Sequence, residues 1–552
     1  MNKSKLKKFA TSLRVELIEI ISSKLDFLLS LDINNLLVAF REHKDSIATI
    51  KNKTNTQEKK EDFIEEVAYT WFNRLIALRF MDANNITNPA VITPLQEGAN
   101  PAIFTLAKEG DIDENLNLDR EKFFDLIDGN INSTNPQNEA YSMLFIATSN
   151  YYATIMPFMF EAIKDYTELL LPDDMLSSNS IRAKVVEAMD NESCKDIEVI
   201  GWLYQFYISQ KKDEVFAALK KNKKITPSNI PAATQLFTPH WIVKYMVENS
   251  LGKLWMQNNP NSSLKEHMKY YIEDNDSSDF LKIENPQDLT LLDPSCGSGH
   301  ILTYAFDLLT LIYEERGYSK SEIPKLILEH NLYGCDIDKR ASTLANFALT
   351  MKARLYYRRF LKKVVETNVI ELQEYEEFKG IKNFGSLLKP KEEEQEEQDG
   401  LLGISNPHYN KQKKLLSSTF TCTVTNPPYM GSKGMNKELS DFVKKHYPDS
   451  KSDLFAVFME RGLEFTKPKG YMAMITMQSW MFLSSYEKLR KKLLKNYSII
   501  TMAHLDNMVM GIAFGTSATI FQKNKPNSNT KGVYFKISLK DLDENREIKG
   551  LW

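Results

Sequence analysis

The feature that most constrains the fold is an apolar run, residues 420–424, that leads directly into Thr425-Asn426-Pro427-Pro428-Tyr429. The run is rich in β-branched residues and predicts a buried strand, which the two prolines must end because proline has no backbone N–H to donate to a ladder. In open α/β folds the carboxyl ends of the strands line the ligand crevice. The stretch therefore puts an amide and an aromatic ring where such folds carry out chemistry.

These residue types suit a reaction at a weakly nucleophilic amine. The exocyclic amino group of a purine is a poor nucleophile because its lone pair is delocalised into the ring. The Asn426 side-chain carbonyl and the Pro427 backbone carbonyl can accept its two hydrogens and hold the lone pair toward an electrophile, while Tyr429 stacks on the base. Taken alone, the motif fits equally well a turn in which Asn426 caps locally and the prolines only end the strand.

A second buried strand is predicted at residues 289–292, which run into Asp293-Pro294-Ser295-Cys296-Gly297-Ser298-Gly299 and then a helix. Glycines at a strand-to-helix turn let a ligand approach the backbone closely. In a dinucleotide site this turn would face pyrophosphate, but the G-x-G-x-x-G fingerprint is incomplete and Asp293 would repel a phosphate. A carboxylate beside the turn instead suits a cofactor with a cationic amino-acid end.

A third predicted strand, residues 332–335, ends at Asp336-Ile337-Asp338. An acid at this position can accept hydrogen bonds from two ribose hydroxyls, and Ile337 offers an apolar face to an adenine. Asp338 is better explained as the N-cap of a helix over residues 339–360, and local capping is also the alternative for Asp336. Residues 383–387 are expected either to end a further strand and reach the same adenine or to form a plain turn.

The rest of the chain divides into two parts by pattern. Apolar residues at helical spacing predict an all-α N-terminal domain over residues 1–229, and alternating strands and helices predict a catalytic domain over residues 230–552. Thr238 followed by Pro239 predicts an N-cap and a first helical residue. An acidic insertion is expected over residues 388–417. Further strands are predicted at residues 470–476, 499–505 and 517–522.

Composition narrows the classes of function. The 552 residues carry a formal net charge of −3, so nucleic-acid contact requires local basic patches such as residues 220–224, 411–414 and 488–492, although each is more typical of a solvated face. The four cysteines have no metal-ligand spacing and predict free thiols and no metal site. With no apolar run of membrane length and no secretion signal, the expected location is the cytoplasm and no membrane partner is expected.

Taken together and in order, the motifs carry a family resemblance. The segments Phe237-Thr238-Pro239, Asp293-Pro-x-x-Gly-x-Gly, Gly334-Cys-Asp336 and Asn426-Pro-Pro-Tyr resemble those of adenine-N6 DNA methyltransferases of the gamma arrangement. Including the helical flank, the chain most closely resembles the adenine methyltransferases of bacterial phage-exclusion (BREX, phage growth limitation) and restriction-modification defence systems. The resemblance implies a Rossmann-like S-adenosylmethionine-dependent methyltransferase core, with a mostly parallel seven-stranded sheet, after an all-α N-terminal domain.

The resemblance also implies roles for individual residues. Two groups of residues are implied. One would bind the cofactor, S-adenosylmethionine, and the other would bind a target adenine that is flipped out of double-stranded DNA. The cofactor-binding group is Phe237, Thr238, Asp293, Pro294, Gly297, Gly299, Asp336 and Ile337. The catalytic group is Asn426, Pro427, Pro428 and Tyr429.

One departure from the resemblance and three alternatives qualify this interpretation. Enzymes of this kind carry a target-recognition region after the catalytic core, whereas this sequence stops soon after its last predicted strand. Sequence-specific reading of DNA is therefore not expected of this chain alone, which is either a truncated gene product or dependent on another subunit of a defence system. The alternatives are a protein glutamine N-methyltransferase, a non-catalytic cofactor-binding subunit and, least favoured, a fused nuclease with its acidic-x-Lys element at Glu42-His43-Lys44.

Overall fold

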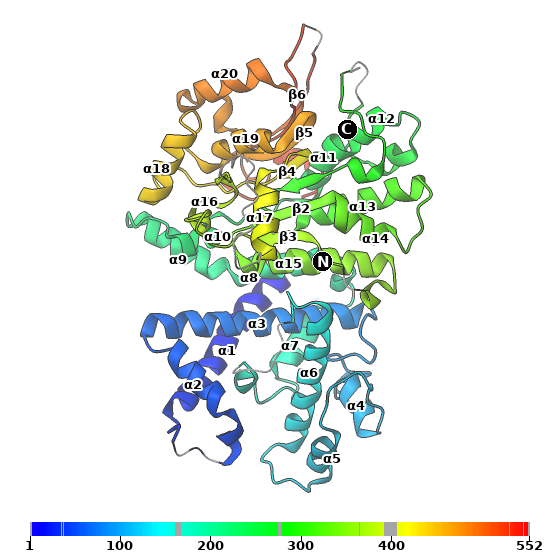
Figure 1. The fold of residues 1–552 in the computed structure, drawn as a ribbon, viewed down its shortest axis with the longest axis vertical. Helices are drawn as coiled ribbons and strands as arrows, with labels where there is room; N and C mark the ends of the chain where they lie inside the picture. The colour runs from blue at the N-terminus through cyan, green and yellow to red at the C-terminus, as the bar shows by residue number, and fades with distance from the viewer. Residues whose placement is uncertain are drawn as a thin grey trace, which may run out of the picture. The chain divides into compact units, whose positions relative to one another are not determined.

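The computed structural model describes residues 3–34, 36, 38–160, 167–273, 279–363, 365–390, 406–528, 530–544 and 546–549. The chain divides into two compact units, Met1–Gln210 and Lys211–Trp552 (Figure 1). The division falls earlier than the expected boundary at residue 229. Residues 211–229 belong to the second unit because Val215 and Ile225 are buried in its core with Met430 and Leu439.

The first unit consists of helices and the segments that connect them, and its described residues contain no β-strand. Its long helices form because apolar residues recur every three or four positions, as in the first helix, where Leu13, Leu17, Ile21 and Leu25 form one buried stripe. The helices are α1 (Lys3–Ser30), α2 (Lys44–Lys53), α3 (Gln57–Ala83), α4 (Ala102–Lys108), α5 (Arg120–Asp128), α6 (Pro136–Ile155), α7 (Ile181–Ala188) and α8 (Glu198–Tyr207).

Helix α3 is buried on nearly all sides, so its charged residues need partners inside the unit. Arg79 donates from Nε to the Met189 carbonyl at 2.7 Å, and Asp82 accepts from the backbone N–H groups of Val91 and Ile92 at 2.9 Å each. These bonds tie α3 to the segments that follow α7 and precede α4.

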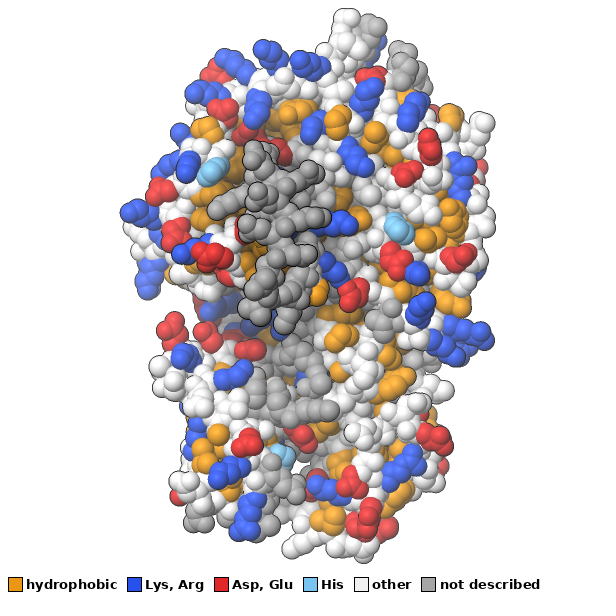
Figure 2. Space-filling model, in the orientation of Figure 1, with side chains coloured by type: hydrophobic (Ala, Val, Ile, Leu, Met, Phe, Trp, Pro, Cys, Tyr) orange, Lys and Arg blue, Asp and Glu red, His pale blue; other side chains and the backbone are white. Residues whose placement is uncertain are grey.

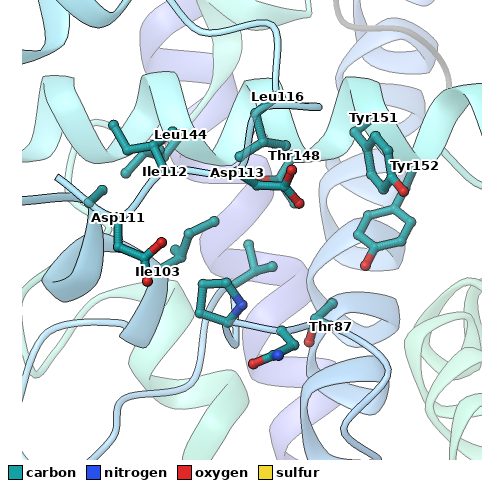
Figure 3. Close-up of a pocket in the computed structure, with 14 residues that line it drawn as sticks. Thr87, Ile103, Asp111, Ile112, Asp113, Leu116, Leu144, Thr148, Tyr151 and Tyr152 are labelled. Carbon is teal, nitrogen blue, oxygen red and sulfur yellow. The ribbon is translucent and has the colours of Figure 1, made fainter.

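A cavity of about 40 Å³ also lies in the helical unit. Asp111, Asp113, Tyr151 and Tyr152 line it together with apolar side chains from α4 and α6 (Figure 3). None of these lining residues belongs to the motifs singled out in the sequence, so this cavity is separate from the predicted site.

The second unit is an α/β domain built on one eight-stranded sheet. Its strand order is β3-β2-β1-β4-β5-β7-β6-β8, and among these strands only β7 runs antiparallel to its neighbours. The strands are β1 (Leu291–Asp293), β2 (Leu332–Asp336), β3 (Asn368–Glu371), β4 (Phe420–Thr425), β5 (Thr466–Met477), β6 (Ser498–Leu505), β7 (Thr516–Gln522) and β8 (Val533–Ile537).

Helices cover both faces of the sheet. Alternation along the strands sends Leu291 and Ile475 into one core, with α11, α13 and α15, and sends Met474 into the other, with α18, α19 and α20. The helices are α9 (Ser209–Lys220), α10 (Ile230–Thr234), α11 (His240–Val247), α12 (Lys253–Asn258), α13 (His300–Glu315), α14 (Ile323–Leu326), α15 (Lys339–Tyr356), α16 (Ile381–Phe384), α17 (Pro407–Ser417), α18 (Lys437–His446), α19 (Leu454–Phe465) and α20 (Glu487–Asn496).

Two features of the sheet differ from the sequence prediction. The sheet has eight strands instead of seven because β8 pairs parallel with β6 at the edge. The strand next to β2 is β3, Asn368–Glu371, and the predicted strand ending at residues 383–387 is wrong. That segment is α16 followed by a 3-10 helix, Gly385–Leu387, and Gly385 has φ +56°, which is incompatible with an extended strand.

The expected acidic insertion is only partly described. Its acidic run, residues 392–397, lies outside the described residues. The end of the range is α17, whose Leu415 and Leu416 are buried against β3 and β4 residues, so this part packs onto the domain instead of being fully solvated. Among the described residues, no helix is both long enough and apolar enough to cross a membrane.

Arg461 of α19 contacts both the start and the end of this insertion. Its guanidinium donates to the carbonyls of Ser386 at 3.0 Å, Leu388 at 3.3 Å and Leu416 at 2.8 Å. Because the guanidinium is buried, these carbonyls satisfy donors that would otherwise be costly to leave unpaired.

Candidate active site

The glycine turn between β1 and α13 adopts a conformation that requires glycine. Gly297 and Gly299 have φ of +52° and +83°. A Cβ on Gly299 would lie 2.9 Å from the Ala345 Cβ on α15, so this position also has no room for a side chain. A Cβ on Gly297 would meet nothing within 4 Å, and the space beside the turn is open to a ligand.

Asp336, at the end of β2, is bonded to this turn. Its Oδ2 accepts from the Gly297 N–H at 3.0 Å and its Oδ1 accepts from the Asp338 N–H at 2.9 Å. Burial raises the pKa of Asp336 to about 6, so the carboxylate is still mostly ionised at neutral pH. Each carboxylate oxygen keeps a free acceptor direction, which is what a pair of ligand hydroxyls needs. Asp338 caps α15, as predicted, by accepting from the Arg340 N–H.

Asp293, at the end of β1, is almost fully buried, with 2% of its surface exposed. It accepts from the Ser295 N–H at 3.2 Å. Burial raises the pKa of Asp293 to about 7, and the nearby Asp336 charge adds to the effect. The carboxyl group therefore holds the start of the glycine turn through the Ser295 N–H.

The asparagine motif lies at the neighbouring strand end. β4 pairs parallel with β1, and Ser295 bridges the two loops, with its Oγ 2.8 Å from the Thr425 Oγ1 and 3.4 Å from the Asn426 backbone oxygen. The glycine turn and Asn426 thus share one edge of the sheet and touch through one hydroxyl. Ser295 was an unassigned position in the motif, and only its contacts reveal this role.

The Asn426 side chain is held in one orientation. Its Nδ2 donates to the Leu236 carbonyl and to the Thr238 Oγ1, both at 3.1 Å. Because a backbone carbonyl can only accept, the amide nitrogen must face it and the amide oxygen must point the other way. That Oδ1 is buried, and no described residue donates a hydrogen bond to it.

Thr238 differs from its predicted capping role. The N-cap of α11 is Pro239, and the Thr238 hydroxyl accepts from Asn426 instead of from the helix. Phe237, one residue earlier, lies against His300 with ring centroids 4.3 Å apart, beside the glycine turn. The segment before α11 is therefore a third loop at the same edge.

Two aromatic rings stand beside the asparagine motif. The Tyr429 hydroxyl donates to the Ile475 carbonyl at 3.0 Å, which fixes its ring. Phe514, in the loop before β7, lies 6.0 Å from that ring in an edge-on arrangement, and Phe455 of α19 lies 6.2 Å away on another side. Within the motif, Pro427 is buried and Pro428 is half-buried.

Ile337 and Pro294 complete the set of predicted residues. Ile337 is half-buried next to Gly385, whose Cβ would lie 3.3 Å from the Ile337 Cγ2. Its carbonyl accepts from Lys382 Nζ at 2.7 Å. The Pro294 carbonyl accepts from the Ser386 hydroxyl at 2.7 Å. The segment around Gly385 therefore lies beside the same edge of the sheet, although it forms no strand.

The sheet order, the glycine turn after β1 and the acid after β2 define a class. The second unit has the fold of an S-adenosylmethionine-dependent methyltransferase, with an eighth strand added at one edge. Residues 330–509 match the family described as Eco57I restriction-modification methylase.

Similar proteins extend the relationship across most of the chain. The adenine-specific methyltransferase BrxX of Escherichia coli O9:H4 (strain HS) is 38% identical over 567 residues, which cover 89% of this chain and 46% of BrxX. The adenine-specific methyltransferase PglX of Lacticaseibacillus casei (strain Zhang) is 36% identical over 558 residues, which cover 88% of this chain and 46% of PglX. Over nearly nine tenths of its length the chain is therefore homologous to these two adenine-specific methyltransferases.

The chain spans about half the length of the curated relatives it matches. Among solved structures, the DrdV–DNA complex aligns with a TM-score of 0.47 and 12% identity, over 97% of this chain and 43% of that one.

Proposed function

We propose that this chain transfers a methyl group from S-adenosylmethionine to the N6 amino group of adenine in DNA. The observation that carries the proposal is the orientation of the Asn426 amide. Its nitrogen is committed to the Leu236 carbonyl and the Thr238 hydroxyl, which leaves Oδ1 as a buried, preorganised acceptor beside the cofactor turn. An amine hydrogen is the donor this oxygen needs, and a fixed dipole costs no reorganisation during the reaction.

The cofactor would be held by residues around the glycine turn. Asp336 would accept from two ribose hydroxyls, Ile337 would contact the adenine ring, and the open side of Gly297 would admit the methionine end. When bound, S-adenosylmethionine supplies a sulfonium methyl group, so that a C–N bond forms as the C–S bond breaks and the amine proton passes to water. The residues themselves contribute position and acceptors, which suits a transfer without a covalent nucleophile.

The target base would be recognised by its flat face and its amine. A paired adenine hides its amino group, so the base must leave the duplex to reach Asn426. Tyr429 and Phe514 provide aromatic surface at that position, and stacking on such rings is worth about 1–3 kcal/mol per base. Asn426 Oδ1 and the Pro427 carbonyl would each accept one amine hydrogen.

A glutamine amide in a protein is the second candidate acceptor because the same two carbonyls suit any weak planar amine. The paired rings of Tyr429 and Phe514 favour a nucleobase, and BrxX and PglX are both described as adenine-specific. The homology to BrxX and PglX and the match to a restriction-modification methylase family also support a role in phage defence of the BREX or restriction-modification kind. We further propose that other subunits of the system are partners of this chain.

The test is methyl transfer by the purified chain from labelled S-adenosylmethionine to double-stranded DNA, with N6-methyladenine measured in the product and a protein mixture as the competing substrate. Asn426→Ala should lower the rate at least about 100-fold, as for loss of a preorganised dipole. Affinity for S-adenosylmethionine should stay unchanged because Asn426 is proposed to contact the target adenine and not the cofactor. Asn410→Ala, at an exposed position on α17, is the matched control and should keep full activity. Full activity in Asn426→Ala, or label found only in protein, would contradict the proposal.

A further inference from the structure

A group of exposed lysines lies at the end of α9. The helix ends in a defined turn, in which the Lys221 and Lys223 N–H groups both donate to the Ala218 carbonyl, at 3.0 and 3.1 Å, and Asn222 has φ +60°. Lys220, Lys221, Lys223 and Lys224 are all exposed around this turn. The backbone therefore presents four cations from one fixed bend.

The bend is attached to the loop that follows the asparagine motif. The Ile225 N–H donates to the Gly434 carbonyl at 3.2 Å, and Lys224 Nζ donates to the Lys433 carbonyl at 2.6 Å. Ile225 is buried against Met430 in the same core. These contacts bring two further exposed lysines, Lys433 and Lys437, to the same surface. We call Lys220, Lys221, Lys223, Lys224, Lys433 and Lys437 together the lysine surface.

The loop also connects this surface directly to the active site. The Met430 N–H donates to Asp453 Oδ1 at 3.0 Å, and the Met430 carbonyl accepts from the Leu454 N–H at 3.1 Å, so the loop is held at the start of α19. Lys433 follows Tyr429 by four residues, a reach of at most about 14 Å. At about 3.4 Å per nucleotide along one strand, this is within about four nucleotides of a base held by Tyr429.

The charge of the lysine surface is not balanced locally. Within the described part of the chain, none of its six lysines lies within the 4.0 Å that defines an ion pair with a carboxylate. The nearby Glu438 accepts from the Asn383 amide at 3.4 Å. A helix C-terminus attracts cations and explains Lys220 and Lys221, but it does not explain why Lys433 and Lys437 join them from another loop.

The arrangement stands out because the whole chain has a formal net charge of −3. Figure 2 shows Lys and Arg side chains along the edge of the second unit where Figure 1 places α9 and α18, with Asp and Glu side chains among them. Like charges gathered without ion-pair partners repel one another, and a row of phosphates relieves that repulsion while releasing counterions.

We propose that the lysine surface binds phosphates of the DNA strand that carries the target adenine. This proposal rests on the proposed function and adds the position of the strand, which would run from the target base beside Tyr429 along the loop after the asparagine motif toward the end of α9. Contacts of this kind set the register of the duplex and carry no sequence information.

The test compares two double variants of the 552-residue chain. Lys223→Gln with Lys433→Gln removes two charges from the lysine surface without touching the Lys224 bond. Lys362→Gln with Lys363→Gln removes two exposed charges that precede β3, at the end of the parallel strands opposite to Asn426. Binding of a fluorescent double-stranded oligonucleotide is measured over a series of salt concentrations, and methyl transfer is measured at limiting and saturating DNA.

The lysine-surface variant should lower the dependence of log K on log salt by about 1 per lysine, so about 2, and should raise KM for DNA while kcat stays within about twofold. The control variant should match the parent in both. Equal salt slopes in the two variants, with methylation of DNA intact in the parent, would overturn the lysine surface and leave the proposed function standing. A parent that binds no DNA at low salt would overturn both.

Discussion

Replacing Thr238 with valine removes one of the two acceptors that orient the Asn426 amide, while nearly preserving side-chain shape. Asn426 Nδ2 would keep its bond to the Leu236 carbonyl and lose its bond to the Thr238 hydroxyl, both at 3.1 Å. Thr238 is 5% exposed, so the freed amide hydrogen would have little access to water. Leaving a buried donor unpaired costs about 1–3 kcal/mol.

This cost would raise the activation free energy of methyl transfer, because Asn426 Oδ1 can accept from the amine only when the amide has the correct orientation. We expect Thr238→Val to lower kcat between about 5-fold and 150-fold. Thr238→Ser keeps the hydroxyl and should stay within about threefold of the parent. Cofactor affinity, measured by calorimetry without DNA, should change less than about twofold in both variants.

The two roles considered for Thr238 give opposite results. A cofactor contact, as the sequence resemblance implies, predicts weaker cofactor binding with kcat preserved at saturation. A positioning role through Asn426 predicts the reverse. A tenfold loss of cofactor affinity in Thr238→Val, with kcat unchanged, would refute the positioning role.

Two further predictions concern the turn after β1. Gly299→Ala should lower the free energy of unfolding by about 2–3 kcal/mol, because its Cβ would lie 2.9 Å from Ala345 in a backbone conformation at φ +83°. Gly297→Ala, with no neighbour within 4 Å, should lower it by about 1 kcal/mol. Chemical denaturation measures both values, and equal losses would contradict the packing argument. The second concerns pH. The pKa of Asp293 is raised by burial to about 7, so the folded state binds a proton that the unfolded chain releases near pH 4, and stability falls as pH rises from about 4 to 7. Relative to Asp293→Asn, the parent should lose up to about 1.4 kcal/mol per pH unit over that range, and a pH-independent difference between the two would contradict a raised pKa.

Much of the catalytic domain can be predicted from the sequence because its central strands are fully buried. Such strands appear as continuous β-branched and apolar runs, as at β4 and β7. The edge strands β3 and β8 are short and partly exposed, so their sequences lack both a buried run and a clear alternation. The edge position therefore explains why one strand was misplaced and another was not predicted.

The sequence predicts which polar residues belong to the site, because they stand in motifs, but it does not predict the contacts that orient them. Asn426 and Asp336 stand at strand ends, where sequence spacing indicates chemistry. The partners that orient Asn426 cannot be predicted in this way. One of them is a backbone carbonyl 190 residues away along the chain, which any residue type would supply. The sequence predicts Thr238 as a helix N-cap because it precedes a proline. In the structure its hydroxyl instead accepts a hydrogen bond from the distant Asn426.

Arg461 ties the two ends of the insertion to the rest of the domain. Its guanidinium donates to the Leu388 carbonyl before the acidic run and to the Leu416 carbonyl after it, and it also holds Ser386, whose hydroxyl donates to the Pro294 carbonyl at the glycine turn. A change in length or composition between Leu388 and α17 would therefore have to break these bonds before it could displace Pro294.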